Sequence, residues 1–509
     1  MKKDMRILLV YPNLPMMLVT PLSIALFTWI LKQEGFEVQL FDSTQYGDGD
    51  LSSPQNRAKY LQARAIFSEE NLKLLKDTEM AADFLKQLET FQPDLLLYSF
   101  TEDALSRALQ LLRVSNTLRI PTVVGGVLAT AAPEWLMSFP EINLLCVGEG
   151  EEVVRDLAFR ISEGRELSDL PNLWIKQADG FVIRNPIRPY VNLDDYSADF
   201  SLFEESRFVR PMGGKIHRAL PLETYRGCPN RCTYCNSPMH NRAARQLNRV
   251  YLRRRSAASI KREVANLIDQ YRANLLYIVD DDFLARPRQE IDAFIAMYQE
   301  FRLPFWFNTR PEHCTLELLR KLKEVGLFRA SFGIESGNED FRVKRLGRNI
   351  SNSRLLSAFA QIDASGIQYS INCIIGFPFE TREMVFDTIR LVKQIKGYDA
   401  VTVSIFTPYR GTVLRDQAIE AGWLDPEALT VHTTASSMLN MPQFTRKQID
   451  GLMRTFPLYV EFDESTWPEI EKAERFEPEG EEILARYAQA YRERRWGGAM
   501  RAGRGRLRF

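Results

Sequence analysis

The stretch YRGCPNRCTYC, residues 225–235, spaces three cysteines as Cys-x3-Cys-x2-Cys directly after an apolar run. Cys228, Cys232 and Cys235 are half of the six cysteines in the chain. Thiolates are soft ligands that suit iron, and a cubane iron–sulfur cluster normally takes four of them. Three thiolates on one loop therefore predict a [4Fe-4S] cluster with one iron left open for another molecule.

Two other interpretations of these cysteines stay open. One is a zinc site with His240, five residues after Cys235, as the fourth ligand, and the other is three unligated thiols. A second Cys-x2-Cys pair would favour zinc, and the chain has none. The spacing therefore favours the iron–sulfur cluster.

Composition limits the classes of protein that remain. The 509 residues are 45% hydrophobic and 26% charged, as expected for a globular protein of two or three domains. The formal net charge is zero, so no global field would draw in nucleic acid or an anionic membrane. The other cysteines, Cys146, Cys314 and Cys373, are scattered in apolar segments and form no disulfide framework, which predicts a reducing cytoplasm. The short apolar segment 16–31 contains Pro21 and predicts a helix rather than a membrane span.

Residues 6–165 alternate between strand-like and helix-like segments. Five apolar runs, with helices between them, predict a doubly wound parallel five-stranded sheet: 7–11, 38–41, 95–98, 121–124 and 144–147. Ligands of such sheets bind at the carboxyl ends of the strands. Those ends carry residues 12–15, 99–101, 125–126 and 148–151. No G-x-G-x-x-G follows the first strand, so a dinucleotide is not the expected ligand.

A second alternating block follows a proline-containing linker. Its six strand-like runs predict a partial (β/α)6 barrel of the TIM type: 222–225, 275–279, 305–308, 329–332, 370–375 and 402–406. We therefore predict a first domain over 1–165, a linker over 166–218, a barrel domain over 219–440 and a C-terminal helical extension over 441–509 that ends in an arginine-rich tail.

The predicted barrel strands end in residues that suit ligand binding. They are Asp280, Asp281 and Asp282 after the second strand, Arg310 after the third, Glu335 after the fourth and Gly376 after the fifth. Any one of them could be a helix cap or a turn. The specific signal is their joint occurrence, in order, behind the cysteine loop.

Over about residues 219–415 these features resemble the core of the radical S-adenosylmethionine (SAM) enzymes. The resemblance implies that Cys228, Cys232 and Cys235 hold a [4Fe-4S] cluster whose open iron chelates the amino and carboxylate groups of SAM. It further implies that Tyr234 lies near the adenine, Asp280, Asp281 and Asp282 near the amino group, Arg310 near the carboxylate, Glu335 near the ribose and Gly376 beside the adenine. The Asp triplet replaces the family's usual Gly-Gly-Glu.

The first block resembles the cobalamin-binding domain that precedes the barrel in cobalamin-dependent radical SAM enzymes. The resemblance implies cofactor contacts at Ser99, Thr101, Gly125, Gly126, Gly148, Glu149 and Gly150, where small residues let the nucleotide tail of cobalamin enter. A packing role for the glycines is the alternative. None of the four histidines lies in residues 1–216, so no histidine of this block can ligate cobalt. The loop 14–17 is the candidate cover for that face.

The two resemblances together imply a methyltransferase that acts on an unactivated carbon of a small-molecule substrate. A 5′-deoxyadenosyl radical would take a hydrogen from the substrate, and methylcobalamin would supply the methyl group. Cyclisation, oxidation or rearrangement without methyl transfer is an alternative, and a non-catalytic cobalamin or iron–sulfur sensor is a more distant one. The cluster implies an electron donor such as flavodoxin or ferredoxin.

Aromatic residues at the barrel strands leave the character of the substrate open. They predict either a bulky apolar substrate or a packed core: Trp306, Phe307, Phe377, Phe379, Phe406 and Tyr409.

Overall fold

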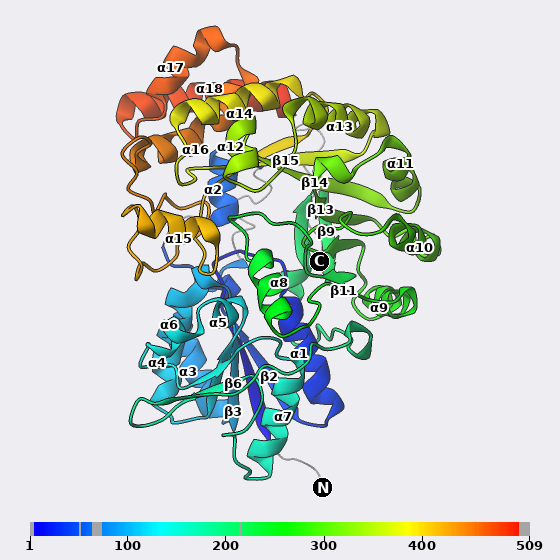
Figure 1. Ribbon diagram of the computed structural model, residues 1–509, viewed down its shortest axis with the longest axis vertical. Helices are drawn as coiled ribbons and strands as arrows, with labels where there is room; N and C mark the ends of the chain where they lie inside the picture. The colour runs from blue at the N-terminus through cyan, green and yellow to red at the C-terminus, as the bar shows by residue number, and fades with distance from the viewer. Residues whose placement is uncertain (1–4, 50–51, 64–73, 213–214, 498–509) are drawn as a thin grey trace.

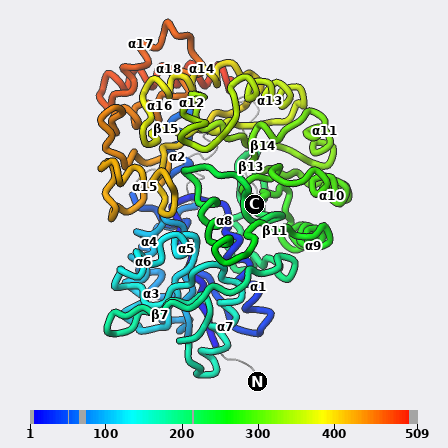
Figure 2. The backbone as a smooth tube through the Cα atoms, viewed as in Figure 1, coloured from blue at the N-terminus to red at the C-terminus, as the bar shows by residue number. Residues whose placement is uncertain are grey.

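The computed structural model describes residues 5–49, 52–63, 74–212 and 215–497. Two α/β units are stacked along the long axis, with the first unit at the bottom of Figure 1 and the second above it. The backbone trace of Figure 2 follows the same path, ending in helices at the top of the second unit. The arginine-rich tail beyond residue 497 lies outside the described residues.

The first sheet has the strand order β2-β1-β3-β4-β5-β6-β7. Five of its strands are parallel, as predicted: β1 (Arg6–Tyr11), β2 (Glu37–Asp42), β3 (Leu95–Ser99), β4 (Thr122–Gly125) and β5 (Leu144–Cys146). Two antiparallel strands, β6 (Leu173–Lys176) and β7 (Val182–Arg184), extend the sheet from the segment expected to be a linker. The first sheet therefore has seven strands and continues past residue 165.

Helices cover both faces of this sheet because successive side chains of a strand point to opposite sides. Ile7 and Leu9 of β1 belong to the core beneath α1 (Leu22–Gln33) and α7 (Glu151–Ser162). Leu8 and Val10 belong to a separate core beneath α3 (Met80–Phe91) and α4 (Leu105–Asn116). The short helices α5 (Val127–Ala131) and α6 (Pro133–Met137) follow β4.

The apolar segment 16–31 supplies α1, as predicted. Among the described residues, no helix is both long and apolar enough to cross a bilayer.

The second sheet has the order β16-β15-β14-β13-β12-β9-β8. Six parallel strands form the predicted partial barrel: β9 (Lys215–Leu222), β12 (Leu275–Ile278), β13 (Phe305–Thr309), β14 (Leu327–Glu335), β15 (Gln368–Ile375) and β16 (Ala400–Ile405). The antiparallel strand β8 (Val209–Met212) is added beyond β9. The barrel is open because β8 and β16 form the two edges of the sheet and do not pair with each other.

Amphipathic helices pack on the outside of the second sheet. They are α9 (Ala257–Asp269), α10 (Arg288–Tyr298), α11 (Leu316–Glu324), α13 (Asn352–Ser365) and α14 (Arg382–Gln394). In α9 the predicted apolar positions Ile260, Val264 and Leu267 are buried, and the Ser256 side chain caps the helix by accepting from Ser259 N. A two-stranded ribbon of β10 (Tyr225–Arg226) and β11 (Arg253–Arg254) frames the cysteine loop and α8 (Ser237–Gln246).

The first unit sends one helix, α2 (Ser53–Lys59), against the open edge of the barrel, where Figure 1 shows it in blue among the elements of the upper unit. Arg57 donates to Val403 O (3.3 Å) and Ser404 Oγ (3.0 Å) of β16. Gln62, just after the helix, accepts from Val403 N at 2.9 Å. Helix α2 therefore covers hydrogen-bonding groups of β16 at an edge where no further strand of the sheet pairs with it.

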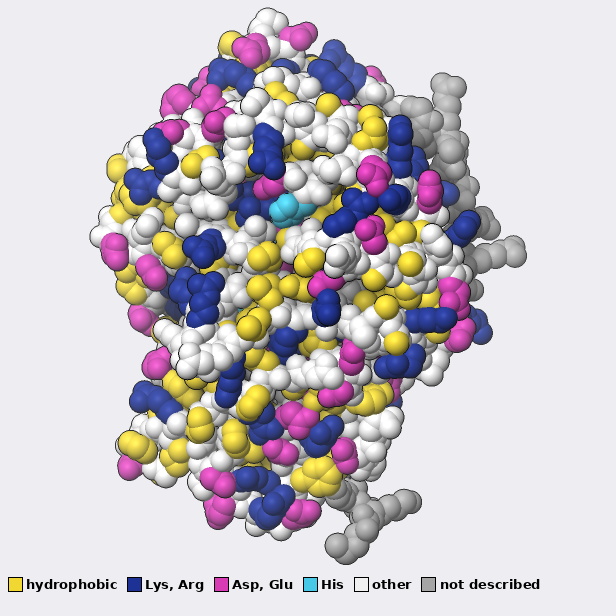
Figure 3. Space-filling view, turned by 45° about the vertical axis from the view of Figure 1, so that its right-hand side comes forward, with side chains coloured by type: hydrophobic (Ala, Val, Ile, Leu, Met, Phe, Trp, Pro, Cys, Tyr) yellow, Lys and Arg dark blue, Asp and Glu magenta, His cyan; other side chains and the backbone are white. Residues whose placement is uncertain are grey.

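After α15 (Val413–Glu420), the C-terminal extension is helical and contains α16 (Arg446–Glu461), α17 (Trp467–Lys472) and α18 (Pro478–Trp496). Helix α16 packs against α14 and β16. The surface in Figure 3 mixes basic and acidic side chains without a continuous basic field, in keeping with a zero net charge.

Candidate functional site

A cavity of about 1480 Å³ lies between the two units and enters the barrel. The first unit contributes loop residues after β1 and β3, including Leu14, Met16 and Thr101, together with α2. The second unit contributes Tyr234 and Cys235 of the cysteine loop and the inward side chains of β13 to β16. The loops that follow parallel strands of both sheets therefore meet at one cavity, as α/β folds place their ligand sites.

The cysteine loop is held by hydrogen bonds from several elements. Asn241 of α8 donates to Cys228 O at 2.7 Å, and Asn230 Nδ2 lies 3.2 Å from Cys228 Sγ. Arg310 Nη2 lies 2.6 Å from Cys232 Sγ. Gly227, which precedes the first cysteine, has φ +97°, and a Cβ there would meet the Tyr251 ring at 2.9 Å. The loop therefore needs a glycine at this position.

The chemistry of the three thiols fits a cluster. Burial raises the pKa of Cys228 to about 12 and also raises the pKa of Cys235, so their thiolates need a bound metal's positive charge. Across the described part of the chain, no three Cys, His, Asp or Glu side chains gather as ligands of a single metal ion. In a cubane cluster each cysteine binds a different iron, so the three sulfurs need not converge on one metal ion. The alternative zinc ligand His240 instead stacks on Tyr251, with ring centroids 4.8 Å apart.

The Asp triplet supports the base of the cysteine loop. Asp280 accepts from Thr224 N (2.8 Å) and Tyr225 N (3.0 Å) and pairs with Arg286. Asp281 accepts from Ser237 Oγ of α8 at 2.8 Å, and Asp282 accepts from Asn230 at 2.9 Å and Thr309 at 2.6 Å. The triplet is therefore engaged with protein groups, and its contact with the SAM amino group stays a prediction.

Glu335 and Tyr234 line the cavity beside the cysteine loop. Glu335 has φ +64° at a register shift of β14, and its carboxylate pairs with Arg348 at 2.8 Å. Burial raises the pKa of Glu335 although Arg348 opposes the shift. A non-glycine residue at positive φ is strained, and such strain is frequent at ligand sites.

Gly376 lies where the end of β15 meets α16. A Cβ on this residue, whose φ is +81°, would meet the Ile449 side chain of α16 at 3.0 Å. Its N–H donates to Glu380 Oε2 at 2.6 Å, so Glu380 fixes the turn after β15. Sequence reasoning named Gly376 and missed both of these partners.

The small residues of the first unit divide into two groups. Thr101 lines the cavity, and Ser99 Oγ lies 3.2 Å from Ser23 Oγ. The glycines face protein atoms. A Cβ added to Gly126 would lie 2.5 Å from Phe100 O, and one added to Gly148 would lie 2.8 Å from Asn172 Nδ2. A Cβ added to Gly150 would lie 2.7 Å from the Phe27 ring, and one added to Gly125 would lie 3.6 Å from Tyr98 O. This geometry favours the packing alternative for Gly126, Gly148 and Gly150.

Glu149 joins the two units. It pairs with Arg226, which directly precedes the cysteine loop, at 2.9 Å, and with Arg253 of β11. Burial alone would raise the pKa of Glu149, but these guanidinium groups outweigh it and hold the pKa below its ordinary value. Glu151 adds a second bond to Arg226 at 2.7 Å. The acidic turn after β5 thus positions the cysteine loop.

The loop expected to cover the cobalt face does line the cavity. Asn13 fixes it by donating to Thr44 Oγ1 (2.8 Å) and Met17 O (3.0 Å), and Met16 has φ +60°. The apolar side chains of Leu14, Met16 and Met17 suit contact with a flat macrocycle.

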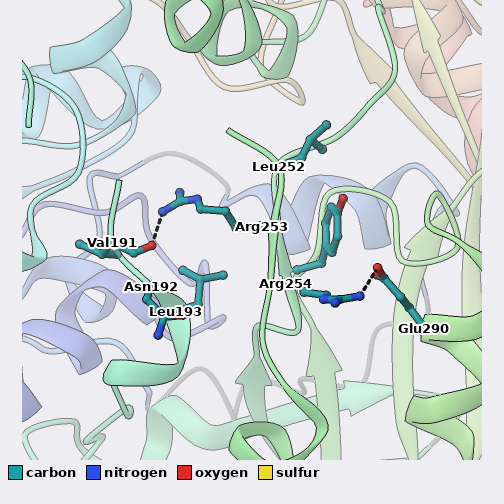
Figure 4. Close-up of a pocket in the computed structure, with 8 residues that line it drawn as sticks. Val191, Asn192, Leu193, Leu252, Arg253, Arg254 and Glu290 are labelled. Atoms are coloured by element: carbon teal, nitrogen blue, oxygen red, sulfur yellow. Dashed lines mark hydrogen bonds and ion pairs between the residues drawn. The ribbon is translucent and has the colours of Figure 1, made fainter. Parts of the chain in front are cut away.

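Among the cavity residues that sequence reasoning missed are Arg57, Arg210 and His432. They come from separate parts of the chain, and no motif joins them. Among the aromatic candidates, Trp306 and Tyr409 line the cavity, whereas Phe307, Phe377 and Phe406 are buried in the core. A smaller cavity of about 310 Å³ lies between residues 191–193 and β11, away from the strand ends, where Arg254 pairs with Glu290 (Figure 4).

Comparison with known protein families agrees with this geometry. Residues 57–158 match the B12 binding domain, and residues 222–392 match the radical SAM superfamily. The chain therefore combines a B12-binding domain with a radical SAM core.

Three relatives are similar to this chain over about two thirds of its length or more. An uncharacterised methyltransferase of Pyrococcus horikoshii is 28% identical over 75% of this chain and 81% of its own. A cytidylyl-2-hydroxyethylphosphonate methyltransferase of Streptomyces wedmorensis is 22% identical over 83% of this chain and 82% of its own length. An anaerobic magnesium-protoporphyrin IX monomethyl ester cyclase of Rubrivivax gelatinosus is 23% identical over 64% of this chain and 58% of its own length.

Two solved structures of cobalamin-dependent or radical SAM enzymes share the fold. OxsB with aqua-cobalamin and SAM bound has a TM-score of 0.64, 16% identity and coverage of 97% of this chain and 72% of its own. The methyltransferase TsrM of Kitasatospora setae has a TM-score of 0.59 and 17% identity, and the match covers 91% of this chain and 82% of the TsrM chain. This protein is a cobalamin-dependent radical SAM enzyme, and its cofactors are a [4Fe-4S] cluster, SAM and cobalamin.

Proposed function

We propose that this enzyme is a C-methyltransferase that acts on an unactivated carbon. The observation that carries the proposal is the single cavity, which is lined by the strand-end loops of the B12-binding domain on one side and by Tyr234 and Cys235 on the other. A substrate in this cavity would contact both domains. The names of two of the relatives, both methyltransferases, support the same reaction class.

When bound, the cofactors supply the reductive cleavage of SAM and the transferable methyl group. The chain's own residues would hold these cofactors. The cluster would bind to Cys228, Cys232 and Cys235. SAM would contact Tyr234, Arg310, Glu335, Gly376 and the Asp triplet, and cobalamin would contact Thr101 and the loop 14–17. Helices α2 and α16 cover the barrel and exclude water, which would quench a reactive intermediate.

The test is turnover of the anaerobically reconstituted enzyme with methyl-deuterated SAM, a reduced flavodoxin or ferredoxin, and a small-molecule cell extract. We expect a deuterated methyl group in one product, formed together with 5′-deoxyadenosine and S-adenosylhomocysteine. Substrate-dependent 5′-deoxyadenosine without any S-adenosylhomocysteine would refute methyl transfer.

A second candidate is a cyclisation or another radical reaction with the same cofactors. The name of the Rubrivivax gelatinosus relative, a cyclase, favours it. A product with an unchanged number of carbon atoms would identify this reaction in the same experiment.

A further inference from the structure

The interior of the barrel is open, and many of the side chains that line it are polar. Side chains at alternate positions of the strands point inward and line the cavity: Trp306 and Asn308 of β13, Arg329, Ser331 and Glu335 of β14, Gln368, Ser370, Asn372 and Ile374 of β15, and Ala400, Thr402 and Ser404 of β16. In a closed TIM barrel bulky branched residues fill these positions. Here serines and threonines leave room and present hydroxyl groups, so the lumen can form hydrogen bonds with a polar ligand.

Arg210 is a cation of this lumen that has no acidic partner among the described residues. Arg210 of β8 lies over the Trp306 ring, with its guanidinium carbon 5.5 Å from the ring centroid. Among the described residues, no side chain forms an ion pair or hydrogen bond with its guanidinium group. Burial lowers the pKa of Arg210, so the surroundings disfavour its charge. Arg210 lines the cavity and is only partly exposed, and a cation in such a site is stabilised by an anionic partner.

The other charges of the cavity leave this site positive. Within the described part of the chain, Arg57 of α2 donates to neutral acceptors only, namely Gln62, Val403 O and Ser404. Arg329 pairs with Asp399, Glu335 with Arg348, and Glu102 with Arg410. The remaining acid, Asp103, belongs to the loop after β3 in the first unit. Arg210 at β8 and Arg57 beside β16 therefore lie at the two edges of the barrel sheet, and among the described residues the cavity carboxylates of Glu335 and Asp399 are paired with other arginines.

We propose that the substrate of this enzyme carries a carboxylate or phosphate group that binds Arg210 inside the barrel, in the field of Arg57. The proposal rests on the proposed function in taking the lumen as the substrate site. The Arg210 guanidinium, beside the Trp306 ring, carries paired N–H donors that match the oxygens of a carboxylate or a phosphate. The serine and threonine hydroxyl groups would bind the rest of a polar substrate. A polar substrate of this kind is an alternative to the bulky apolar substrate that the aromatic residues predicted.

The test measures anion binding without turnover. Inorganic phosphate and benzoate are titrated calorimetrically, in low-chloride buffer, into the reconstituted enzyme and into Arg210→Gln and Arg210→Lys variants. We expect saturable binding of at least one anion, an affinity about tenfold or more weaker in Arg210→Gln, and partial retention in Arg210→Lys. Preference for phosphate or for benzoate would separate a phosphorylated substrate from a carboxylic acid.

The chain offers a matched control in Arg184 of β7, which also lies over a tryptophan, Trp174, at 5.1 Å but is exposed outside the cavity. Arg184→Gln should bind the anions as the wild type does. No saturable binding by the wild type, or equal binding by Arg210→Gln, would overturn the proposal.

A second measurement keeps the test decisive if Arg210→Gln does not fold. Phenylglyoxal modifies accessible guanidinium groups, and the anion that binds should protect residue 210 of the wild type while leaving residue 184 reactive. Equal modification of residue 210 with and without both anions would overturn the proposal. Because neither measurement needs methyl transfer, failure of the methyltransferase test with intact anion binding would leave the anion site standing for the alternative radical reaction.

Discussion

At the scale of single residues, the three cluster cysteines have distinct surroundings but one expected role. Replacing Cys232 with Ala removes the thiolate beside Arg310 and leaves too few protein ligands for a stable cluster. We expect this variant to lose nearly all iron after anaerobic reconstitution and to form no 5′-deoxyadenosine. Cys314→Ala, which changes a buried cysteine outside the loop, is the control and should keep its iron. Equal iron contents in the two variants would contradict the assignment.

Glu380 gives a pH dependence that belongs to one carboxyl group. Burial raises its pKa to about 8, although Gly376 N and Phe377 N donate to it, and its Oε1 has no partner within the described residues. The folded protein keeps this group protonated between the ordinary carboxyl pKa and about 8, whereas the unfolded chain does not. The folded state therefore binds more protons, and its stability falls as pH rises through that window.

Glutamine in place of Glu380 should remove this dependence while its amide oxygen still accepts the two backbone bonds. We expect Glu380→Gln to match the wild type near pH 5 and to be more stable above pH 8. The difference should be a few kcal/mol at most, because each tenfold change in proton affinity corresponds to about 1.4 kcal/mol. Thermal unfolding at both pH values measures it. A wild-type advantage at pH 8.5 would show that the carboxyl group is ionised in the fold.

At the scale of elements, α2 is the link that closes the barrel edge. Gln62 accepts from Val403 N of β16 and donates toward Met453 O of α16 at 3.4 Å. Gln62→Ala would leave the buried Val403 N–H without its acceptor, which typically costs about 1–3 kcal/mol. We expect a lower melting temperature and faster proteolysis near α2, with Lys59→Ala on the exposed side as the control. Unchanged stability would mean that α2 does not depend on this contact.

At the scale of the whole molecule, Glu149 couples the B12-binding domain to the cluster loop. Its replacement by Gln leaves Arg226 with Glu151 and Glu223 but takes the carboxylate from Arg253. Removing one partner of a buried ion pair typically lowers the stability of the folded protein by about 3–5 kcal/mol. We expect Glu149→Gln to bind cobalamin normally and to retain less iron after reconstitution, which metal and cobalamin analysis of one sample would show. Normal iron retention would refute the coupling.

The sequence by itself determined the two α/β units, the cluster loop and the cofactor set, because each depends on local signals. Periodic apolar runs specify strands and helices, and the Cys-x3-Cys-x2-Cys run places three thiolates on one loop whatever surrounds it. The linker between the two units was expected to hold weak strands, but the antiparallel strands β6 to β8 were not assigned to either sheet, because short strands at sheet edges have a weak pattern. The sequence also named Glu149 and the glycines, but not their contacts.

Only the tertiary structure decided which of these residues share the cavity. Arg57 and Arg210 are far apart in the chain and meet the same lumen because the barrel sheet curls and α2 crosses from the other domain. The Asp triplet lies at a strand end, as predicted, yet its oxygens accept from Thr224, Ser237 and Asn230. A periodic pattern specifies which face of an element is buried, but the partner on that face depends on long-range packing. The polar side chains that line the lumen could therefore be recognised only from the tertiary structure.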